Sequence, residues 1–244
     1  MTNITLKEAW NFALEQFPEI DIEIAHIVYD ELVTVYTDPV REYHSSGHIE
    51  NFINKLNELL RIYAFDEHDK VKAELIFAAF FHDYFHNAHR HTQEIPIDSL
   101  SDEEMSADFA LNALKRMGVR PSKSVSRIYQ LIKLTETHQL DNTSQCSIQM
   151  QKVFLDADMA ILGDIDPKYE EYMVGVWKEY AHIPPETFMT GRINFLSQLL
   201  EKNAIFHTVY MNQLYRDQAF KNISYEIGIL DKMNAEQLIK AIQG

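Results

Sequence analysis

The stretch VKAELIFAAFFHDYF, residues 71–85, decides the fold of this chain of 244 residues. Its apolar side chains would cover nearly every side of a helix rather than a single face. They are Ala73, Leu75, Ile76, Phe77, Ala78, Ala79, Phe80 and Phe81. A helix of this kind is buried in the middle of a domain. The stretch therefore predicts a central helix that carries His82 and Asp83 near its end.

Amphipathic helices are expected on both sides of this central segment. Apolar residues recur at helical spacing in residues 5–17, 20–35, 46–63, 101–117 and 122–137, residues 148–162 indicate a buried helix that Gly163 closes, and Pro184-Pro185 precedes a further segment over 186–202. Thr5 with Glu8, and Ser101 with Glu104, have the spacing of capping boxes, which mark helix starts. Only seven Gly and seven Pro occur, which favours long helices over a turn-rich β fold. We expect an all-α fold, an irregular helical bundle, in which residues 1–244 form a single domain.

The acidic charge of the chain limits its partners. Asp and Glu total 37 against 22 Lys and Arg, which gives a formal net charge of −15. This charge repels a phosphate backbone, and no block of five or six Lys or Arg residues offsets it. We therefore expect no binding to duplex nucleic acid.

No feature of the sequence points to a membrane or to an oxidising compartment. The first residues lack a basic start followed by an apolar run, and no uninterrupted stretch of about 20 apolar residues follows. Cys146 is the only cysteine, which excludes an intramolecular disulfide and a cysteine-based zinc site. We expect a cytoplasmic protein without a membrane partner, and the pattern leaves its oligomeric state open.

Histidine and aspartate side chains interrupt apolar surroundings at three places. His82 and Asp83 follow the central apolar run, and another apolar run contains Asp156 and Asp158, so that at least one of these two carboxylates lies in an apolar setting. His44 and His48 stand four residues apart, so they share a face if their helix begins early enough. Burying an imidazole or a carboxylate is costly unless an ion pair or a divalent cation offsets it. Three such insertions in one chain indicate one shared site, either a metal site or a buried ion pair.

Five ordered segments carry a family resemblance. They are Tyr43-His44-x-x-x-His48, Phe81-His82-Asp83, Glu104-x-Ser106-Ala107, Thr135-x-x-His138 and Asp156-Ala157-Asp158-Met159-Ala160-Ile161-Leu162-Gly163. Together they resemble the HD-domain superfamily of metal-dependent phosphohydrolases, and more narrowly a bacterial group of predicted HD-superfamily phosphohydrolases. The likeness runs from about residue 41 to residue 163, roughly half of the chain. It implies an all-α domain of the HD type, with residues 165–244 as additional helices.

The resemblance also implies a metal site. In the superfamily a His, a His-Asp pair and a later Asp bind the metal, and these positions correspond to His48, His82, Asp83 and Asp158. Such ligands suit Mn, Fe, Co, Ni, Zn and, less well, Mg. The expected reaction is hydrolysis of a small phosphomonoester or phosphodiester, for example of a nucleotide.

Further roles follow from the same resemblance. The Tyr-His-x-x-x-His segment is similar to one in cyclic-nucleotide phosphodiesterases, in which the first His protonates the leaving oxygen, so His44 is the expected general acid. Glu104 and His138 are expected to orient the nucleophile or to bind a second ion. Arg41 is the nearest candidate to bind the substrate phosphate, although an Arg at the surface is the simpler interpretation.

The chain departs from the narrower group directly after Asp83. The resemblance leads us to expect an aliphatic pair and then Tyr-Asp, whereas Tyr84-Phe85-His86-Asn87 stands here. His86 is therefore a candidate ligand of a second metal, or a local replacement.

Two other functions are compatible with these residues. A di-iron oxygenase of the HD type would need two more ligands between Asp83 and Asp158. The available side chains are His86, His89, His91 and His138. A non-catalytic domain that senses a metal or a nucleotide would be favoured by the loss of a ligand or of His44, and neither is lost.

Overall fold

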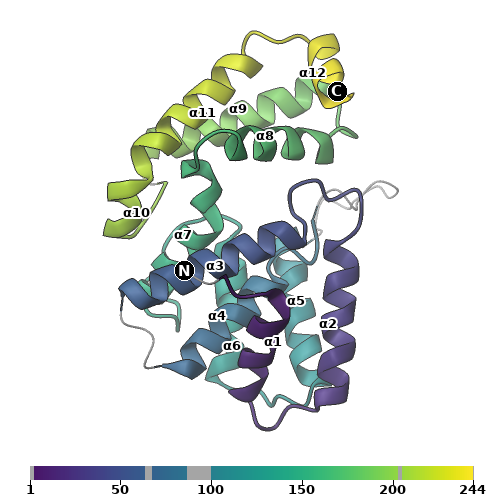
Figure 1. The fold of residues 1–244 in the computed structure, drawn as a ribbon, viewed down its shortest axis with the longest axis vertical. Helices are drawn as coiled ribbons and strands as arrows, with labels where there is room; N and C mark the ends of the chain where they lie inside the picture. Colours follow the sequence, from purple (N-terminus) through teal and green to yellow (C-terminus); the bar gives the residue numbers. More distant parts are fainter. Residues whose placement is uncertain (1–2, 64–67, 87–99, 203–204, 244) are drawn as a thin grey trace. The chain divides into compact units, whose positions relative to one another are not determined.

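The computed structural model describes residues 3–63, 68–86, 100–202 and 205–243. These residues form helices and no strand, which confirms the predicted all-α class (Figure 1). None of the described helices is long and apolar enough to cross a membrane. The chain divides into two compact units: Met1–Pro39 with His44–Ala157 forms unit 1, and Val40–Tyr43 with Asp158–Gly244 forms unit 2. The expected single domain over residues 1–244 stays a prediction.

Unit 1 is built around the central helix α4 (Asp69–Phe81), and every side chain from Ala73 to Phe81 is buried. The helices in contact with α4 are α1 (Leu6–Glu15), α3 (Ser46–Ile62), α5 (Asp102–Arg116) and α6 (Lys123–Leu134). The unit also contains α2 (Ile22–Tyr36), which contacts α1, and nearly all of α7 (Ile148–Asp158). The expected central helix is therefore present.

Aromatic rings hold α1 against α4. Trp10 is fully buried, and its ring meets Phe77 and Phe80 edge to face at centroid distances of 5.2 and 5.1 Å. Phe17, just after α1, meets Phe77 at 5.4 Å. Edge-to-face pairs of this kind stabilise a core by about 0.5–1.5 kcal/mol each beyond the burial of their area. The start of α1 is fixed by the predicted capping box of Thr5 and Glu8.

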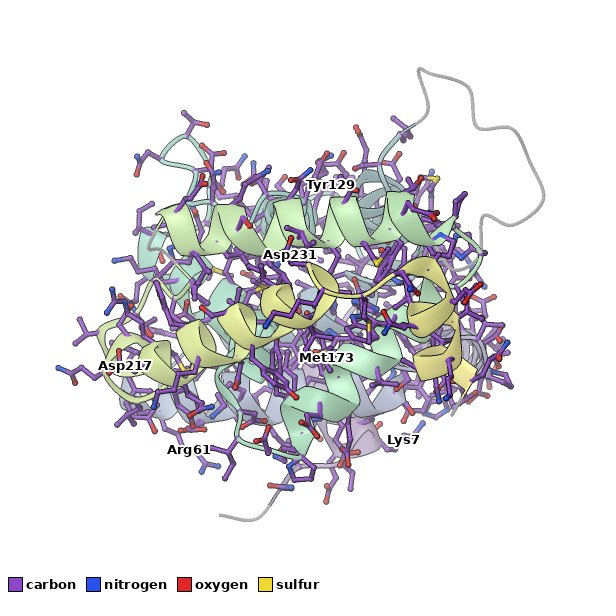
Figure 2. All side chains as sticks on the ribbon, turned by 90° about the horizontal axis from the view of Figure 1, so that it is seen from above. Lys7, Arg61, Tyr129, Met173, Asp217 and Asp231 are labelled. Carbon is purple, nitrogen blue, oxygen red and sulfur yellow. The ribbon has the colours of Figure 1, made fainter. Side chains whose placement is uncertain are left out.

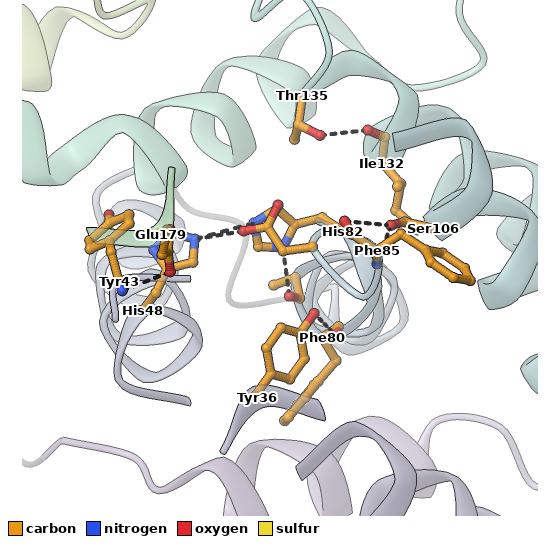
Figure 3. A network of polar contacts seen from close by, with 12 residues as sticks. Tyr36, Tyr43, His48, Phe80, His82, Phe85, Ser106, Ile132, Thr135 and Glu179 are labelled. Carbon is orange, nitrogen blue, oxygen red and sulfur yellow. Dashed lines mark hydrogen bonds and ion pairs between the residues drawn. The ribbon is translucent and has the colours of Figure 1, made fainter. Parts of the chain in front are cut away.

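The central helix ends earlier than the apolar pattern suggests, at Phe81 instead of Phe85. Continuation would require the carbonyl groups of Ala79 and Phe80 to accept helical hydrogen bonds from residues 83 and 84. Side chains bind these carbonyls instead: Nδ1 of His82 lies 2.9 Å from the Ala79 oxygen, and the Tyr36 hydroxyl donates to the Phe80 oxygen at 2.9 Å (Figure 3). His82 and Asp83 therefore lie in a turn that follows the helix.

The helix that carries His48 begins at Ser46. His44 lies in the turn before it, so the helix does not begin early enough for His44 and His48 to share one helical face. The expected helix over residues 122–137 stops at Leu134, and the one over residues 148–162 is α-helical only to Asp158.

Unit 2 consists of the segment 40–43 and the helices after α7. They are the 3-10 helix η2 (Met159–Gly163), α8 (Lys168–Glu179), α9 (Pro185–Lys202), α10 (Val209–Leu214), α11 (Arg216–Leu230) and α12 (Ala235–Gln243). Helix α11 contacts both η2 and α9, while α12 contacts α8 and α9. Figure 2 shows Asp217 and Asp231 near the two ends of α11 and Met173 on α8.

We expect Phe77→Ala to lower the free energy of unfolding of unit 1 by about 3–5 kcal/mol, because it leaves a cavity beneath Trp10 and Phe17. Ile27→Ala, at a side chain that is 50% exposed on α2, is the control and should change stability by less than about 0.5 kcal/mol. Chemical denaturation of both variants measures the difference. Similar losses in the two variants would contradict the central position of α4.

Candidate metal centre

Two helices of unit 1 bring three side chains together. His48 lies in the first turn of α3, His82 directly follows α4, and Asp83 is the next residue. Helices α3 and α4 are in contact. The two histidines are buried, with exposed fractions of 6% for His48 and 1% for His82. Asp83 keeps 18% of its side chain exposed, which leaves the group a side open to solvent.

The potential ligand atoms of these residues form a small triangle. Nε2 of His48 lies 3.2 Å from Nε2 of His82, and Oδ2 of Asp83 lies 3.4 Å from the first and 3.0 Å from the second. Neighbouring ligands held about 2.1 Å from a metal are about 3.0 Å apart in an octahedron and about 3.4 Å apart in a tetrahedron. The triangle therefore has the size of one face of a metal coordination shell.

The tautomer of His82 follows from its second contact. Nδ1 of His82 lies 2.9 Å from the carbonyl oxygen of Ala79, and because a carbonyl only accepts, Nδ1 carries the hydrogen. In a ring that is neutral, Nε2 then carries a lone pair, the form in which histidine binds metals. Nε2 lies close to a carboxylate oxygen and to another imidazole nitrogen. Either a proton on the imidazoles or a divalent cation would stabilise this arrangement.

The carboxyl group of Asp83 is ionised at neutral pH. Burial alone would raise its pKa, but the charge of His82, hydrogen bonds from His48 and His82, and the charge of His44 hold the pKa well below its usual range. A carboxylate that is already deprotonated needs to release no proton when it binds a metal.

Two more histidines lie beside this triangle. The ring of His44 lies 5.7 Å from that of His48, and the ring of His86 lies 3.9 Å from that of His44. Histidine and acidic side chains in the described part of the chain form groups that could hold a metal ion. His48 and His82 belong to one group, and His44 and His86 belong to another. The sequence pointed to His86 only as a departure from the resembled family.

The turn that contains Asp83 and His86 is held by α5. The backbone N–H of Phe85 donates to the hydroxyl of Ser106 at 3.0 Å, and the rings of Tyr84 and Phe109 stack at 3.6 Å. Ser106 is part of a motif in the sequence, yet its role depends on a partner 21 residues away. Sequence alone could not assign this contact.

Glu104 and His138 belong to unit 1 and make contacts with residues outside the triangle. Glu104, in the first turn of α5, forms an ion pair with Lys133 of α6 at 3.3 Å. His138 follows α6 with a left-handed φ of 51°, and its N–H donates to the Leu134 oxygen. Neither residue belongs to a group of potential metal ligands within the described ranges. Their catalytic roles stay predictions.

The remaining predicted site residues belong to unit 2 or lie outside the described residues. Arg41 belongs to unit 2 and is only 3% exposed, so the simpler interpretation of an Arg at the surface is wrong. Asp158 is the last residue of α7 and begins the long segment of unit 2. His89 and His91 lie outside the described residues.

Comparisons with known proteins identify no relative: no family model, curated protein or solved structure matches the chain.

We expect purified protein to retain a divalent transition metal and His82→Ala to lose it, because two of the three triangle edges end at His82. His26→Ala, at an exposed histidine of α2, is the matched control and should keep the metal. Elemental analysis after dialysis measures both. Equal metal content in the two variants would rule out the triangle as the binding site.

Metal affinity should weaken as the pH falls from about 8 to about 5, since His48 and His82 must be neutral to bind and free histidine titrates near pH 6.5. The carboxylate of Asp83 should contribute nothing to this dependence, because its pKa lies well below the range. Titration with a competing chelator at several pH values measures the affinity. A constant affinity over this range would argue against histidine ligands.

Proposed function

We propose that this protein is a metal-dependent phosphohydrolase that cleaves a phosphomonoester or phosphodiester of a small substrate, such as a nucleotide. The observation that carries the proposal is the triangle of His48, His82 and Asp83, whose edges measure 3.0–3.4 Å. Two imidazoles and one carboxylate suit Mn, Fe, Co, Ni or Zn better than Mg. The ordered resemblance to HD-domain phosphohydrolases supports the same reaction.

Asp158 is proposed as the fourth ligand. It ends α7, one helical turn beyond Phe154 on the same face. The ring of Phe154 lies 5.0 Å from Phe52, and the ring of Phe52 lies 5.1 Å from His82. Helix α7 thus packs, through two aromatic rings, against a proposed metal ligand and carries Asp158 at its next turn.

The proposed chemistry divides between the cation and the protein. A divalent cation held by these ligands would lower the pKa of a water molecule and polarise a phosphoryl oxygen. His44 is proposed to donate a proton to the leaving oxygen, since imidazole has a pKa close to neutrality. Its ring lies 5.7 Å from the His48 ring, next to the proposed ligands. Arg41 is proposed to pair with the substrate phosphate.

The reaction class is tested by incubating the protein with nucleoside monophosphates, cyclic nucleotides, sugar phosphates and nitrophenyl phosphates, each with Mn, Fe, Co, Ni, Zn or Mg. We expect phosphate ester hydrolysis that a chelator abolishes and a transition metal restores. Metal binding without any hydrolysis would contradict the proposal and favour a non-catalytic metal or nucleotide sensor.

We expect His44→Asn to retain the metal but to slow hydrolysis by about 10²- to 10⁴-fold, the usual contribution of a positioned general acid. The loss should shrink for nitrophenyl substrates, because a good leaving group departs without protonation. Rates for a series of leaving groups measure this dependence, with His26→Asn as the control.

Equal losses for good and poor leaving groups would show that His44 has another role, such as binding the substrate. Loss of metal from His44→Asn would instead show that His44 is a ligand, as its grouping with His86 allows.

A further inference from the structure

The four residues that precede His44 belong to unit 2, although the chain on both sides of them belongs to unit 1. Only the peptide bond between Tyr43 and His44 separates this segment from the proposed general acid. Contacts that hold the backbone of Tyr43 in place therefore restrict the positions that His44 can take.

One face of α8 binds this segment. The backbone N–H of Tyr43 donates to Oε1 of Glu179 at 2.8 Å, and the ring of Tyr43 meets that of Tyr172 edge to face at 4.5 Å. Tyr172, Gly175 and Glu179 are spaced by three and four residues, so they share one side of the helix. We call them the Tyr43-binding face.

Gly175 allows the close approach of the two segments. A Cβ atom at this position would lie 3.2 Å from Cβ of Tyr43 and 3.4 Å from the backbone oxygen of Glu42. Contacts this short require a neighbour to move by a few tenths of an ångström. The absence of a side chain at Gly175 therefore sets the distance between α8 and the backbone that leads to His44.

Hydrogen bonds and a buried ion pair within unit 2 hold Tyr172 of the Tyr43-binding face in place. The hydroxyl of Tyr172 accepts a hydrogen bond from Arg192 of α9 at 2.9 Å. Arg192 in turn pairs with Glu226 of α11 at 2.8 Å, and Glu226 is fully buried. Tyr169 and Trp177 also donate to Glu226, at 2.7 and 3.0 Å. A buried ion pair with its hydrogen bonds satisfied is costly to disturb, because a lone buried charge would remain.

We propose that α8 positions the general acid: Gly175 and Glu179 fix the backbone of Tyr43, and this fixes His44. The inference rests on the proposed role of His44 in phosphate ester hydrolysis and assigns a task to residues 165–244. Gly175 and Glu179 are positioning residues that act through the Tyr43–His44 peptide. Displacement of a reacting group by about 1 Å can slow catalysis by about 10²-fold.

Gly175→Ala adds one methyl group to α8 and tests whether the close approach of α8 to Tyr43 positions His44. Alanine is favoured over glycine inside a helix by about 1 kcal/mol, so the variant should fold and resist heat as well as the parent. We expect kcat to fall about 3- to 10-fold with unchanged KM and metal content, and the loss should shrink for nitrophenyl leaving groups.

Gly191→Ala in α9 is the matched control, because a Cβ there meets no atom within 4 Å. It should leave kcat unchanged. If the parent hydrolyses phosphate esters but Gly175→Ala behaves like Gly191→Ala, the positioning role is refuted. If the parent hydrolyses none, the proposed function itself fails.

Amide hydrogen exchange at Tyr43 tests the contact without any assay of activity. Gln offers a carbonyl oxygen in place of the carboxylate, so Glu179→Gln should keep the amide of Tyr43 protected, whereas Glu179→Ala should accelerate its exchange at least tenfold. Rapid exchange in both variants, or in neither, would overturn the role of Glu179 as the acceptor that fixes Tyr43.

Discussion

The structure of unit 1 depends on where its buried central helix stops. Helix α4 is buried on nearly all sides, and it ends at Phe81, where side chains of His82 and Tyr36 bind the carbonyl oxygens of Ala79 and Phe80. The contact between His82 and Ala79 places the hydrogen of a neutral ring on Nδ1, with Nε2 close to His48 and Asp83. A proton or a divalent cation would stabilise these three ligand atoms. The end of the helix and the candidate metal centre therefore share one residue, His82.

Much of the fold could be predicted from local patterns. The apolar run over residues 71–85 indicated a buried helix, and the capping residues Thr5 and Ser101 indicated two helix starts that the structure confirms. No local pattern marked the end of α4, where one contact comes from Tyr36, which lies 44 residues before its acceptor Phe80. Because α4 ends at Phe81, His82 and Asp83 lie in a turn and not in the predicted helix. Both side chains lie close to His48 there.

Some residues of the candidate site could be predicted from the sequence, and others could not. His48, His82 and Asp83 were expected together from the ordered motifs, and the structure brings these three side chains into contact. His86 was expected only as a second-metal ligand or a local replacement, and its contact with His44 could not be predicted because it depends on how the turn after α4 folds. The bond between Tyr43 and Glu179 spans 136 residues, and no local pattern marks either partner. Contacts between distant segments therefore account for most of what the sequence did not reveal.

The central claim is that His48 and His82 bind the metal through their imidazole nitrogens. X-ray absorption at the metal K edge, on protein loaded with stoichiometric Zn or Mn, tests it most directly. The account predicts imidazole scattering, with nitrogen ligands at about 2.0–2.1 Å for Zn, and its loss in His82→Ala. A spectrum that shows oxygen ligands alone would contradict the account.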